Sequence, residues 1–496
     1  MTILIVVSAV LLGLRLYAAT HVGFGDSEAL YASYALHSQP AYLDHPGLIG
    51  LVARTIGEGT APTPTRAHVV TAILATATPW IGWAAARGLG ATKHAATIAA
   101  IVLAVCPEIA VGLFGLTPDL LLAPLWLGAL GLAGFGLRSD DDTRSACALV
   151  AAGLLSGIAC AAKVSGGLLL LALATTYVSV AIMRFRQANL PKGRLVYGWA
   201  GLAAGLVILL PIVFYEARTG WPMIRHRFVD TQTTAGVSLR NIGAVLGGQA
   251  LYVSPLFLWL AYRATRRVIA ERCETPIARL LFLAFAVPLL PLLILSIWSR
   301  VAEPHWLAPP FLALLLYGAI SVEPLASRRA FVFATAVAAL FTAAAHAWVL
   351  IPESARLMPK DSDPKLDIAS ELYGWPAVTE AAREQMATPY DPEGRKVVVV
   401  GPHWTVCAQL HAALPGIRVG CATPIPDDFD RWLPRDEWRK AENVLYVTDN
   451  RFEGDGAEQL PGHLERSRGR VRILRGGRSA RIFTFYLYGR TAGALR

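Results

Sequence analysis

Charged side chains are scarce in this chain. Asp, Glu, Lys and Arg together make up 16% of its 496 residues, whereas soluble proteins of ordinary composition carry about 25%. The shortage coincides with repeated apolar runs of about 20 residues, the length that a helix needs to cross the hydrocarbon core of a bilayer. Composition and run length exclude an ordinary soluble globular protein and predict a polytopic helical membrane protein.

Motifs for nucleotides and metals are also lacking. Neither G-x-G-x-x-G nor a P-loop occurs between a predicted strand and a predicted helix, which argues against direct binding of a nucleotide-linked substrate. The six cysteines show no metal-ligand spacing, although a disulfide between Cys407 and Cys421 stays an open alternative if their region is extracytoplasmic. The net charge of +10 comes mostly from short loops between apolar runs, so it indicates membrane topology rather than nucleic-acid binding.

The apolar runs predict about eleven membrane spans with the N-terminus in the cytoplasm. Residues 1–20 lack a basic n-region and are interrupted by Arg15, which favours an uncleaved first span over a signal peptide. This orientation places the compact Arg-rich loops inside, and the odd number of spans places the C-terminal region outside. The predicted spans are residues 2–20, 67–86, 95–113, 117–137, 146–162, 165–183, 195–215, 243–262, 280–298, 306–322 and 330–351.

The composition changes after Ile351. Residues 1–351 are the expected membrane domain, whose long first outer loop, residues 21–66, predicts short interfacial helices. No span-length apolar run follows, and residues 352–496 predict a small α/β domain on the outer face. Its expected strands are residues 396–401, 443–449 and 481–488, and its expected helices are residues 378–386 and 405–413.

Charged and His-bearing motifs of the apolar part fall at one end of the predicted spans. They are far apart in the sequence, but the alternation of the spans brings them to the same outer membrane face. Polar groups gathered at one end of an apolar bundle predict a reaction site at the lipid–water boundary, because ionisable groups are costly deeper in the membrane. The candidate residues are Asp26, Glu28, Asp44, His45, Asp119, Lys163, Arg225, His305 and Trp306.

Several of these residues also have a structural interpretation. Asp26 can cap the helix that follows it, and Asp119 can stabilise the N-terminus of its own helix. The basic stretch around Arg225 can contact lipid headgroups, and Trp306 can anchor the chain at the interface. An isolated Lys163 at an outer turn breaks the positive-inside pattern, so anion binding and a structural role are both open for it, and His305 can be a structural histidine rather than a ligand.

The order and spacing of the motifs resemble a known superfamily. Residues 24–31 (FGDSEALY) and 42–46 (YLDHP) are similar to the first periplasmic loop of bacterial relatives of the protein O-mannosyltransferases. That superfamily includes the lipid A aminoarabinose transferases and has the membrane GT-C fold. The resemblance spans roughly residues 20–320 and continues through TPD (117–119), GIACAAK (157–163), TGWP (219–222), Gly248-Gln249 and HWLAP (305–309).

The resemblance implies an inverting glycosyltransferase at the outer face of the bacterial cytoplasmic membrane. Its members move a sugar from a polyprenyl-phosphate carrier to an acceptor on a protein Ser or Thr, or on an envelope glycolipid or glycan. Asp26 matches the expected general base, with Glu28 as second candidate and Gln249 as a further substrate contact. This chain departs from the usual adjacent Asp-Glu by inserting Ser27, and His45 stands where the aminoarabinose transferases carry Lys.

The residue types fit this chemistry independently of the resemblance. A phosphate is a good leaving group, so its departure needs cations more than a proton donor, and one carboxylate suffices to activate the acceptor. We therefore expect Asp26 to accept the acceptor's proton and Asp119 to orient the acceptor or the sugar. The expected substrate-binding residues are Asp44, His45, Lys163, Arg225, Gln249, His305 and Trp306, of which His45, Lys163 and Arg225 hold the lipid phosphate.

Two other classes of function stay open at this point. A transporter or flippase of lipid-linked sugar would show internal repeats and polar groups near the membrane midplane, whereas this chain has no internal repeat and gathers its polar groups at one end. A membrane scaffold would use the outer domain to bind a partner. We expect no cofactor besides the lipid-linked co-substrate; a divalent metal near the acids and His305 is left open without supporting ligand spacing.

Overall fold

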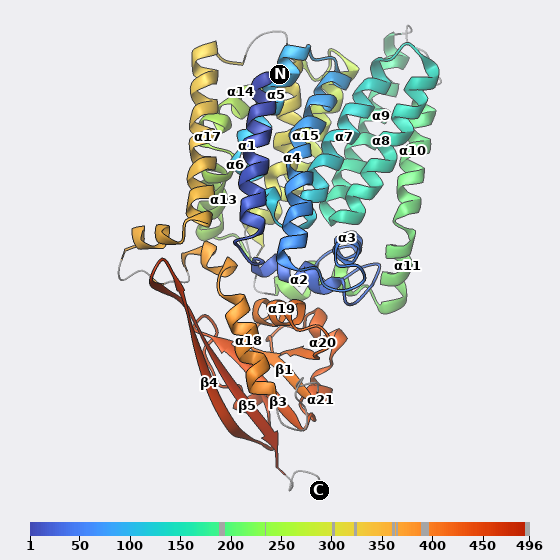
Figure 1. Ribbon diagram of the computed structural model, residues 1–496. Helices are drawn as coiled ribbons and strands as arrows, with labels where there is room; N and C mark the ends of the chain where they lie inside the picture. The colour runs from blue at the N-terminus through green and yellow to red at the C-terminus, as the bar shows by residue number, and fades with distance from the viewer. Residues whose placement is uncertain are drawn as a thin grey trace. The chain divides into compact units, whose positions relative to one another are not determined.

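The chain folds into two compact units (Figure 1). The computed structural model describes residues 1–187, 194–233, 235–299, 303–321, 325–359, 363, 366–387 and 396–491. The helical unit comprises Met1–Arg15, Asp44–Ile49 and Thr71–Ala345, and the sheet unit comprises Leu16–Leu43, Gly50–Val70 and His346–Arg496. Most of the first long loop thus belongs to the same unit as the C-terminal region.

The apolar helices make this a multi-pass membrane protein. In the part of the chain that the structure describes, seven candidate spans are long and apolar enough to cross a membrane, or up to ten if each bent helix pair counts as one span. The expected count of eleven stays a prediction. The seven spans involve α1 (Thr2–Ala19), α4 (Pro64–Leu89), α7 (Pro118–Arg138), α8 (Asp142–Ala162), α9 (Gly167–Gln187), α15 (Pro276–Trp298) and α17 (Arg328–Leu350).

Three further apolar stretches bend by more than 40°. They are α5 (Lys93–Val105) with α6 (Pro107–Ala110) and η1 (Gly112–Phe114), α10 (Leu195–Ile208) with α11 (Leu210–Thr219), and α13 (Leu239–Tyr252) with α14 (Pro255–Glu271). The span expected at residues 306–322 corresponds to η4 (Pro304–Leu307) and α16 (Ala308–Ile320), and residue 322 lies outside the described residues. The remaining short elements before α13 are η2 (Val164–Gly166), α12 (Pro222–Phe228) and η3 (Asp230–Gln232).

Glycines bring α8 and α10 into close contact. A Cβ atom on Gly153 would lie 2.1 Å from the carbonyl carbon of Gly201, and one on Gly157 would lie 2.3 Å from the carbonyl oxygen of Gly205. Each helix therefore presents two glycines four residues apart, the small-residue pattern that lets membrane helices approach backbone to backbone. Helix α8 also packs against α7 (Figure 1). Trp126 of α7 is fully buried in the core.

Gly153→Leu is expected to destabilise the protein by roughly 1–3 kcal/mol or more, because the added side chain has no room against α10. The measurement is the melting temperature of the detergent-purified protein. Gly13→Leu is the matched control, since a Cβ at exposed Gly13 on α1 meets nothing within 4 Å. Equal melting temperatures for the two variants would contradict the packing described here.

The sheet unit is built on a five-stranded mixed sheet of order β2-β1-β3-β5-β4. β1 pairs in parallel with β2 and β3, whereas β5 pairs antiparallel with β3 and β4. The strands are β1 (Val397–Gly401), β2 (Val419–Cys421), β3 (Asn443–Asp449), β4 (His463–Arg475) and β5 (Arg478–Arg490). The helical elements that belong to this unit wholly or, for α3, in large part are α2 (Asp26–Tyr34), α3 (Leu48–Ile56), η5 (Pro352–Leu357), η7 (Ile368–Leu372), α18 (Trp375–Met386), α19 (Trp404–Ala413), α20 (Asp428–Trp432), α21 (Arg435–Trp438) and η8 (Ala457–Gln459).

All three expected strands are present, and β2 and β4 were missed. β1 and β3 are rows of buried β-branched and aromatic residues, the pattern typical of strands covered on both faces. β2 has only three residues, and β4 exposes polar side chains along most of its length, so neither carries an alternating apolar signal. The two expected helices correspond to α18 and α19.

The first-loop helix α2 packs against α19 inside the sheet unit. Ser33 donates a hydrogen bond to the carbonyl oxygen of Ala408 at 3.2 Å, and Leu43 N donates to Asp428 Oδ2 at 3.1 Å. Tyr34 is completely buried, so this face of the expected interfacial helix contacts protein. Through α2 the sheet unit positions Asp26.

Candidate functional site

The predicted site residues are divided between the two units. Asp26 and Glu28 belong to the sheet unit, whereas the other eight belong to the helical unit. Each unit gathers its own cluster of charged groups. We call these the Asp26 cluster (Asp26, Glu371, Gln409, Asp449, Arg451 and Arg481) and the Lys163 cluster (Asp44, His45, Asp119, Lys163, Arg227 and His305).

Glu28 serves the local structure of α2. Gly25 is the N-cap of the helix, and its backbone N–H donates to Glu28 Oε2 at 2.9 Å. The other oxygen, Oε1, lies 2.9 Å from Nε2 of the buried His68. Both carboxylate oxygens of Glu28 are therefore engaged, and the bond from Gly25 N–H is the half of a capping box that an acid at the third helical position supplies.

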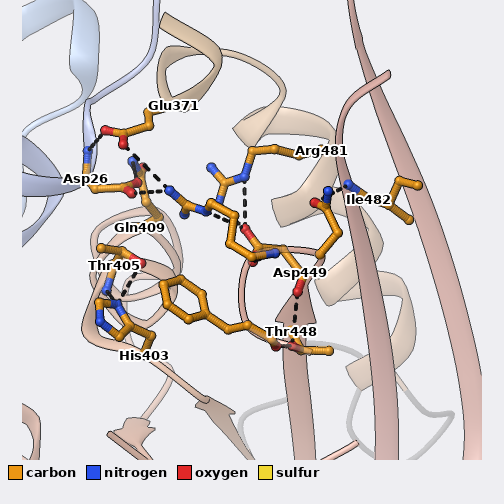
Figure 2. Close-up of polar contacts among 12 residues, drawn as sticks. Asp26, Glu371, His403, Thr405, Gln409, Thr448, Asp449, Arg481 and Ile482 are labelled. Carbon is orange, nitrogen blue, oxygen red and sulfur yellow. Dashed lines mark hydrogen bonds and ion pairs between the residues drawn. The ribbon is translucent and has the colours of Figure 1, made fainter. Parts of the chain in front are cut away.

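Asp26, the first residue of α2, is held by side chains from the C-terminal region (Figure 2). It is only 4% exposed, and its Oδ2 accepts a hydrogen bond from Arg451 Nη1 at 2.8 Å. Gln409 Nε2 lies 3.4 Å from Asp26 Oδ1 and donates to the carbonyl oxygen of Phe24 at 2.8 Å. A buried carboxylate with a guanidinium partner is a stable arrangement for a charge removed from water.

Arg451 is itself anchored by Asp449 at the end of β3. The Asp449 side chain is fully buried and its Oδ2 accepts from Arg451 Nε at 3.0 Å and from Arg481 Nη2 at 2.5 Å. Arg481 on β5 lies 4.6 Å from the ring centroids of both Trp375 and Phe483. These contacts connect the sheet to Asp26 through a continuous row of ion pairs, seen in Figure 2.

Glu371 is the second carboxylate beside Asp26. Its Oε1 lies 3.6 Å from Arg451 Nη1, and its Oε2 lies 3.5 Å from the backbone nitrogen of Asp26. Burial raises the pKa of Glu371 to about 7; the Asp26 carboxylate adds to the rise and Arg451 opposes it. Glu371 was not predicted from the sequence, because it lies outside every motif on which the predicted site was based.

The Lys163 cluster is centred on an ion pair at helix ends. Lys163, the C-cap of α8, donates through Nζ to both oxygens of Asp119, at 2.8 and 2.7 Å. Asp119 lies in the first turn of α7, where Pro118 favours the helix start and the helix dipole favours an acid. His305 Nε2 is 3.6 Å from Asp119 Oδ2, so three residues predicted from separate motifs meet here.

Asp44 and His45 join the same cluster. Asp44 Oδ1 lies 3.6 Å from Arg227 Nη1 and 4.0 Å from His226 Nε2. Burial lowers the pKa of His45 well below its usual value, and the positive charges of Arg227 and Lys163 lower it further. His45 is therefore neutral at physiological pH and is suited to hydrogen bonding rather than to ionic attraction.

The remaining predicted residues differ in their surroundings. Gln249 Nε2 donates to the carbonyl oxygen of Pro304 at 2.5 Å, which ties α13 to the segment that carries His305. Trp306 is half-buried in η4. Arg225 is exposed, and no ion pair among the described residues includes it; Arg227, two positions further along α12, approaches Asp44 instead.

In the part of the chain that the structure describes, no group of three or more His, Cys, Asp or Glu side chains is arranged to hold a metal ion. The expectation that the protein works without a metal stays a prediction.

Lys163→Met is expected to destabilise the protein by about 3–5 kcal/mol, because it leaves the Asp119 carboxylate partly buried without its cation. Lys163→Met combined with Asp119→Leu should recover part of that loss, since both charges are then removed. Thermal unfolding of the purified variants measures the coupling. The exposed Lys93→Met is the matched control, and additive effects of the two site substitutions would contradict a coupled pair.

Comparison with known proteins identifies the fold. The family described as dolichyl-phosphate-mannose-protein mannosyltransferase matches residues 44–215. ArnT from Cupriavidus metallidurans, in a crystal structure bound to undecaprenyl phosphate, matches with a TM-score of 0.62 and 16% sequence identity over 98% of this chain and 97% of that chain. No curated protein matches the sequence.

Two further solved structures match over most of this chain. The archaeal oligosaccharyltransferase AglB from Archaeoglobus fulgidus, in complex with an inhibitory peptide and a dolichol-phosphate, has a TM-score of 0.51 and 12% identity, covering 92% of this chain and 70% of that chain. The arabinofuranosyltransferase AftD from Mycobacteria has a TM-score of 0.55 and 16% identity, covering 98% of this chain and 41% of that chain. The resemblance found in the sequence is confirmed, and the chain has the GT-C fold of these membrane glycosyltransferases.

Proposed function

We propose that this protein is an inverting glycosyltransferase that uses a polyprenyl-phosphate-linked sugar as donor. The observation that carries the proposal is the placement of Asp26: a buried carboxylate at the start of α2, fixed by Arg451 and Gln409. Two proteins of the same fold support the choice of donor, since ArnT is bound to undecaprenyl phosphate and AglB to a dolichol-phosphate.

Asp26 is the proposed general base. An ionised carboxylate has about four lone-pair positions, and Arg451 and Gln409 occupy two of them, which leaves capacity to accept the proton of an acceptor hydroxyl. The acceptor oxygen then attacks the anomeric carbon on the face opposite the phosphate. The carbon–oxygen bond to phosphate breaks, its electron pair leaves with the phosphate, and the anomeric configuration inverts. Glu28 is less suited, because both of its oxygens are already engaged.

The Lys163 cluster is the proposed holder of the donor phosphate. Lys163 has three N–H donors and Arg227 has five, so both keep donors for phosphate oxygens beyond those that meet Asp119 and Asp44. Neutral His45 contributes hydrogen bonding. These groups are in place before the reaction and stabilise the charge that develops on the departing phosphate, which needs no proton donor.

The proposal also includes the side of the membrane on which the reaction takes place and the chemical class of the acceptor. We place the reaction at the outer face of the bacterial cytoplasmic membrane, with the C-terminal region extracytoplasmic, because this orientation puts the compact Arg-rich loops inside. The proposed acceptor is a hydroxyl of a protein or of an envelope glycolipid or glycan, because a general base acts on a group that must lose a proton.

Asp26→Asn is expected to lower sugar transfer by roughly 10²–10⁴-fold, since the amide keeps the shape of the side chain but cannot accept the proton. The measurement is release of radiolabel from a polyprenyl-phosphate sugar into a new product with membrane extract as the source of acceptor. Asp140→Asn, at an exposed position between α7 and α8, is the matched control and should stay active. A folded Asp26→Asn protein with full activity would remove Asp26 from the role of base.

A further inference from the structure

We propose that Arg451 positions Asp26 and the incoming acceptor hydroxyl, and that Glu371 sets how this site responds to pH. The inference rests on the glycosyl transfer proposed above. It makes the C-terminal region a part of the catalytic machinery rather than an appended binding domain.

One guanidinium group contacts three carboxylates. Arg451 meets Asp26 through Nη1 at 2.8 Å, Glu371 through the same nitrogen at 3.6 Å, and Asp449 through Nε at 3.0 Å. The backbone of Arg451 is held as well, since its N–H donates to Asp449 Oδ1 at 2.9 Å. The side chain is thus fixed at both ends, and Asp26 is fixed through it.

The anchoring continues behind Arg451. Asp449 also forms an ion pair with Arg481, and the Arg481 guanidinium lies against two aromatic rings. These contacts restrict the movement of both Asp449 and Arg481. The Arg451 guanidinium lies 5.4 Å from the ring centroid of Phe452, and that ring stacks on His403 with centroids 4.1 Å apart. A general base works only when its oxygen is held close to the productive geometry, because a displacement of about 1 Å costs about 10²-fold in rate.

The second terminal nitrogen of Arg451 offers the acceptor a hydrogen-bond donor. Nη2 is buried and has no hydrogen-bond partner among the described residues. An unsatisfied donor beside a general base matches an acceptor hydroxyl, whose oxygen accepts from Nη2 while its hydrogen points to Asp26. This pair of contacts aligns the acceptor before the proton moves.

Glu371 adds a charge that depends on pH. The charged groups that affect it come from three elements: Asp26 on α2, Arg451 after β3, and Arg481 on β5. Because the pKa of Glu371 is about 7, its carboxyl is neutral below that pH and ionised above it. Ionised Glu371 attracts Arg451 Nη1, 3.6 Å away, and so helps to fix Asp26 through Arg451; activity should therefore rise as pH increases through about 7. His403 does not add to this rise, because burial lowers its pKa to about 4.

The test compares Arg451→Ala, Arg451→Lys and Glu371→Gln with the wild type in the radiolabel transfer assay. Arg451→Ala should lower kcat by about 100-fold. Arg451→Lys should recover part of this loss by keeping one charge. Glu371→Gln should remove the rise in activity near pH 7. Arg468→Ala, on an exposed part of β4, is the matched control.

The outcomes separate this inference from the proposed function. A wild-type protein without transfer activity overturns the glycosyltransferase itself. An active wild type whose Arg451→Lys and Arg451→Ala variants match it in kcat, or whose rise near pH 7 persists in Glu371→Gln, overturns the role of Arg451 and Glu371 alone. Binding of polyprenyl phosphate should be unchanged in these variants, which distinguishes misplacement of the base from loss of donor binding.

A separate observation points to a disulfide between Cys407 and Cys421. Both residues are free cysteines in this structure and are fully buried, and their thiol sulfur atoms, on α19 and β2, lie 2.9 Å apart. Burial raises the pKa of the Cys421 thiol far above its usual value, so the folded protein offers little thiolate for exchange. We infer that the bond forms while the region folds: a thiol–disulfide oxidoreductase accepts two electrons and two protons from the thiols and becomes a dithiol.

Mass spectrometry without reduction tests the disulfide. Protein from native membranes, denatured in the presence of an alkylating agent, should yield a peptide pair joined through Cys407 and Cys421 and two hydrogens lighter than the sum of its parts. Cys407→Ser should abolish the pair, while Cys147 and Cys273, both exposed, carry the alkyl group and serve as internal controls. Alkylation of both Cys407 and Cys421 in the wild type would overturn the inference.

Discussion

The buried carboxylate of Asp449 is the fixed point on which the Asp26 cluster depends. It forms ion pairs with both Arg451 and Arg481, and Arg451 in turn forms an ion pair with Asp26. Without this anion, two guanidinium groups would lie side by side in a largely buried place, at high electrostatic cost. The position of Asp26 at the start of α2 is therefore determined by the strand ends of the C-terminal sheet as much as by its own helix.

In the Lys163 cluster, as in the Asp26 cluster, the cations are paired with acids of the protein itself. Lys163 meets Asp119, and Arg227 approaches Asp44, so no cation in this group is left without an acid. Such pairing lowers the cost of placing charges at the ends of membrane helices. It also leaves part of each cation's donor capacity unused, as the proposed binding of a phosphate requires. Both clusters are thus preorganised, which is the condition under which fixed charges accelerate a reaction.

Local patterns in the sequence predicted much of the fold, and contacts distant in sequence explain what it missed. β1 and β3 were predictable because they are continuous buried apolar runs, whereas β4 is polar on most of its surface. Asp26 was found from its motif, but Arg451 lies 425 positions away and gave no local signal. Arg225 and Arg227 share one short helix, and composition alone does not tell which of them turns toward Asp44.

This chain shares its fold with membrane glycosyltransferases, and the reaction proposed for it specifies the direction of attack on the sugar. In the proposed chemistry the phosphate leaves without covalent help and Asp26 acts on the acceptor rather than on the sugar, so the reaction has a single displacement step. The most direct measurement is the anomeric configuration of the transferred sugar, determined by NMR of the purified product and compared with that of the lipid-phosphate donor. The account predicts the opposite configuration. A product that retains the configuration of the donor would contradict it.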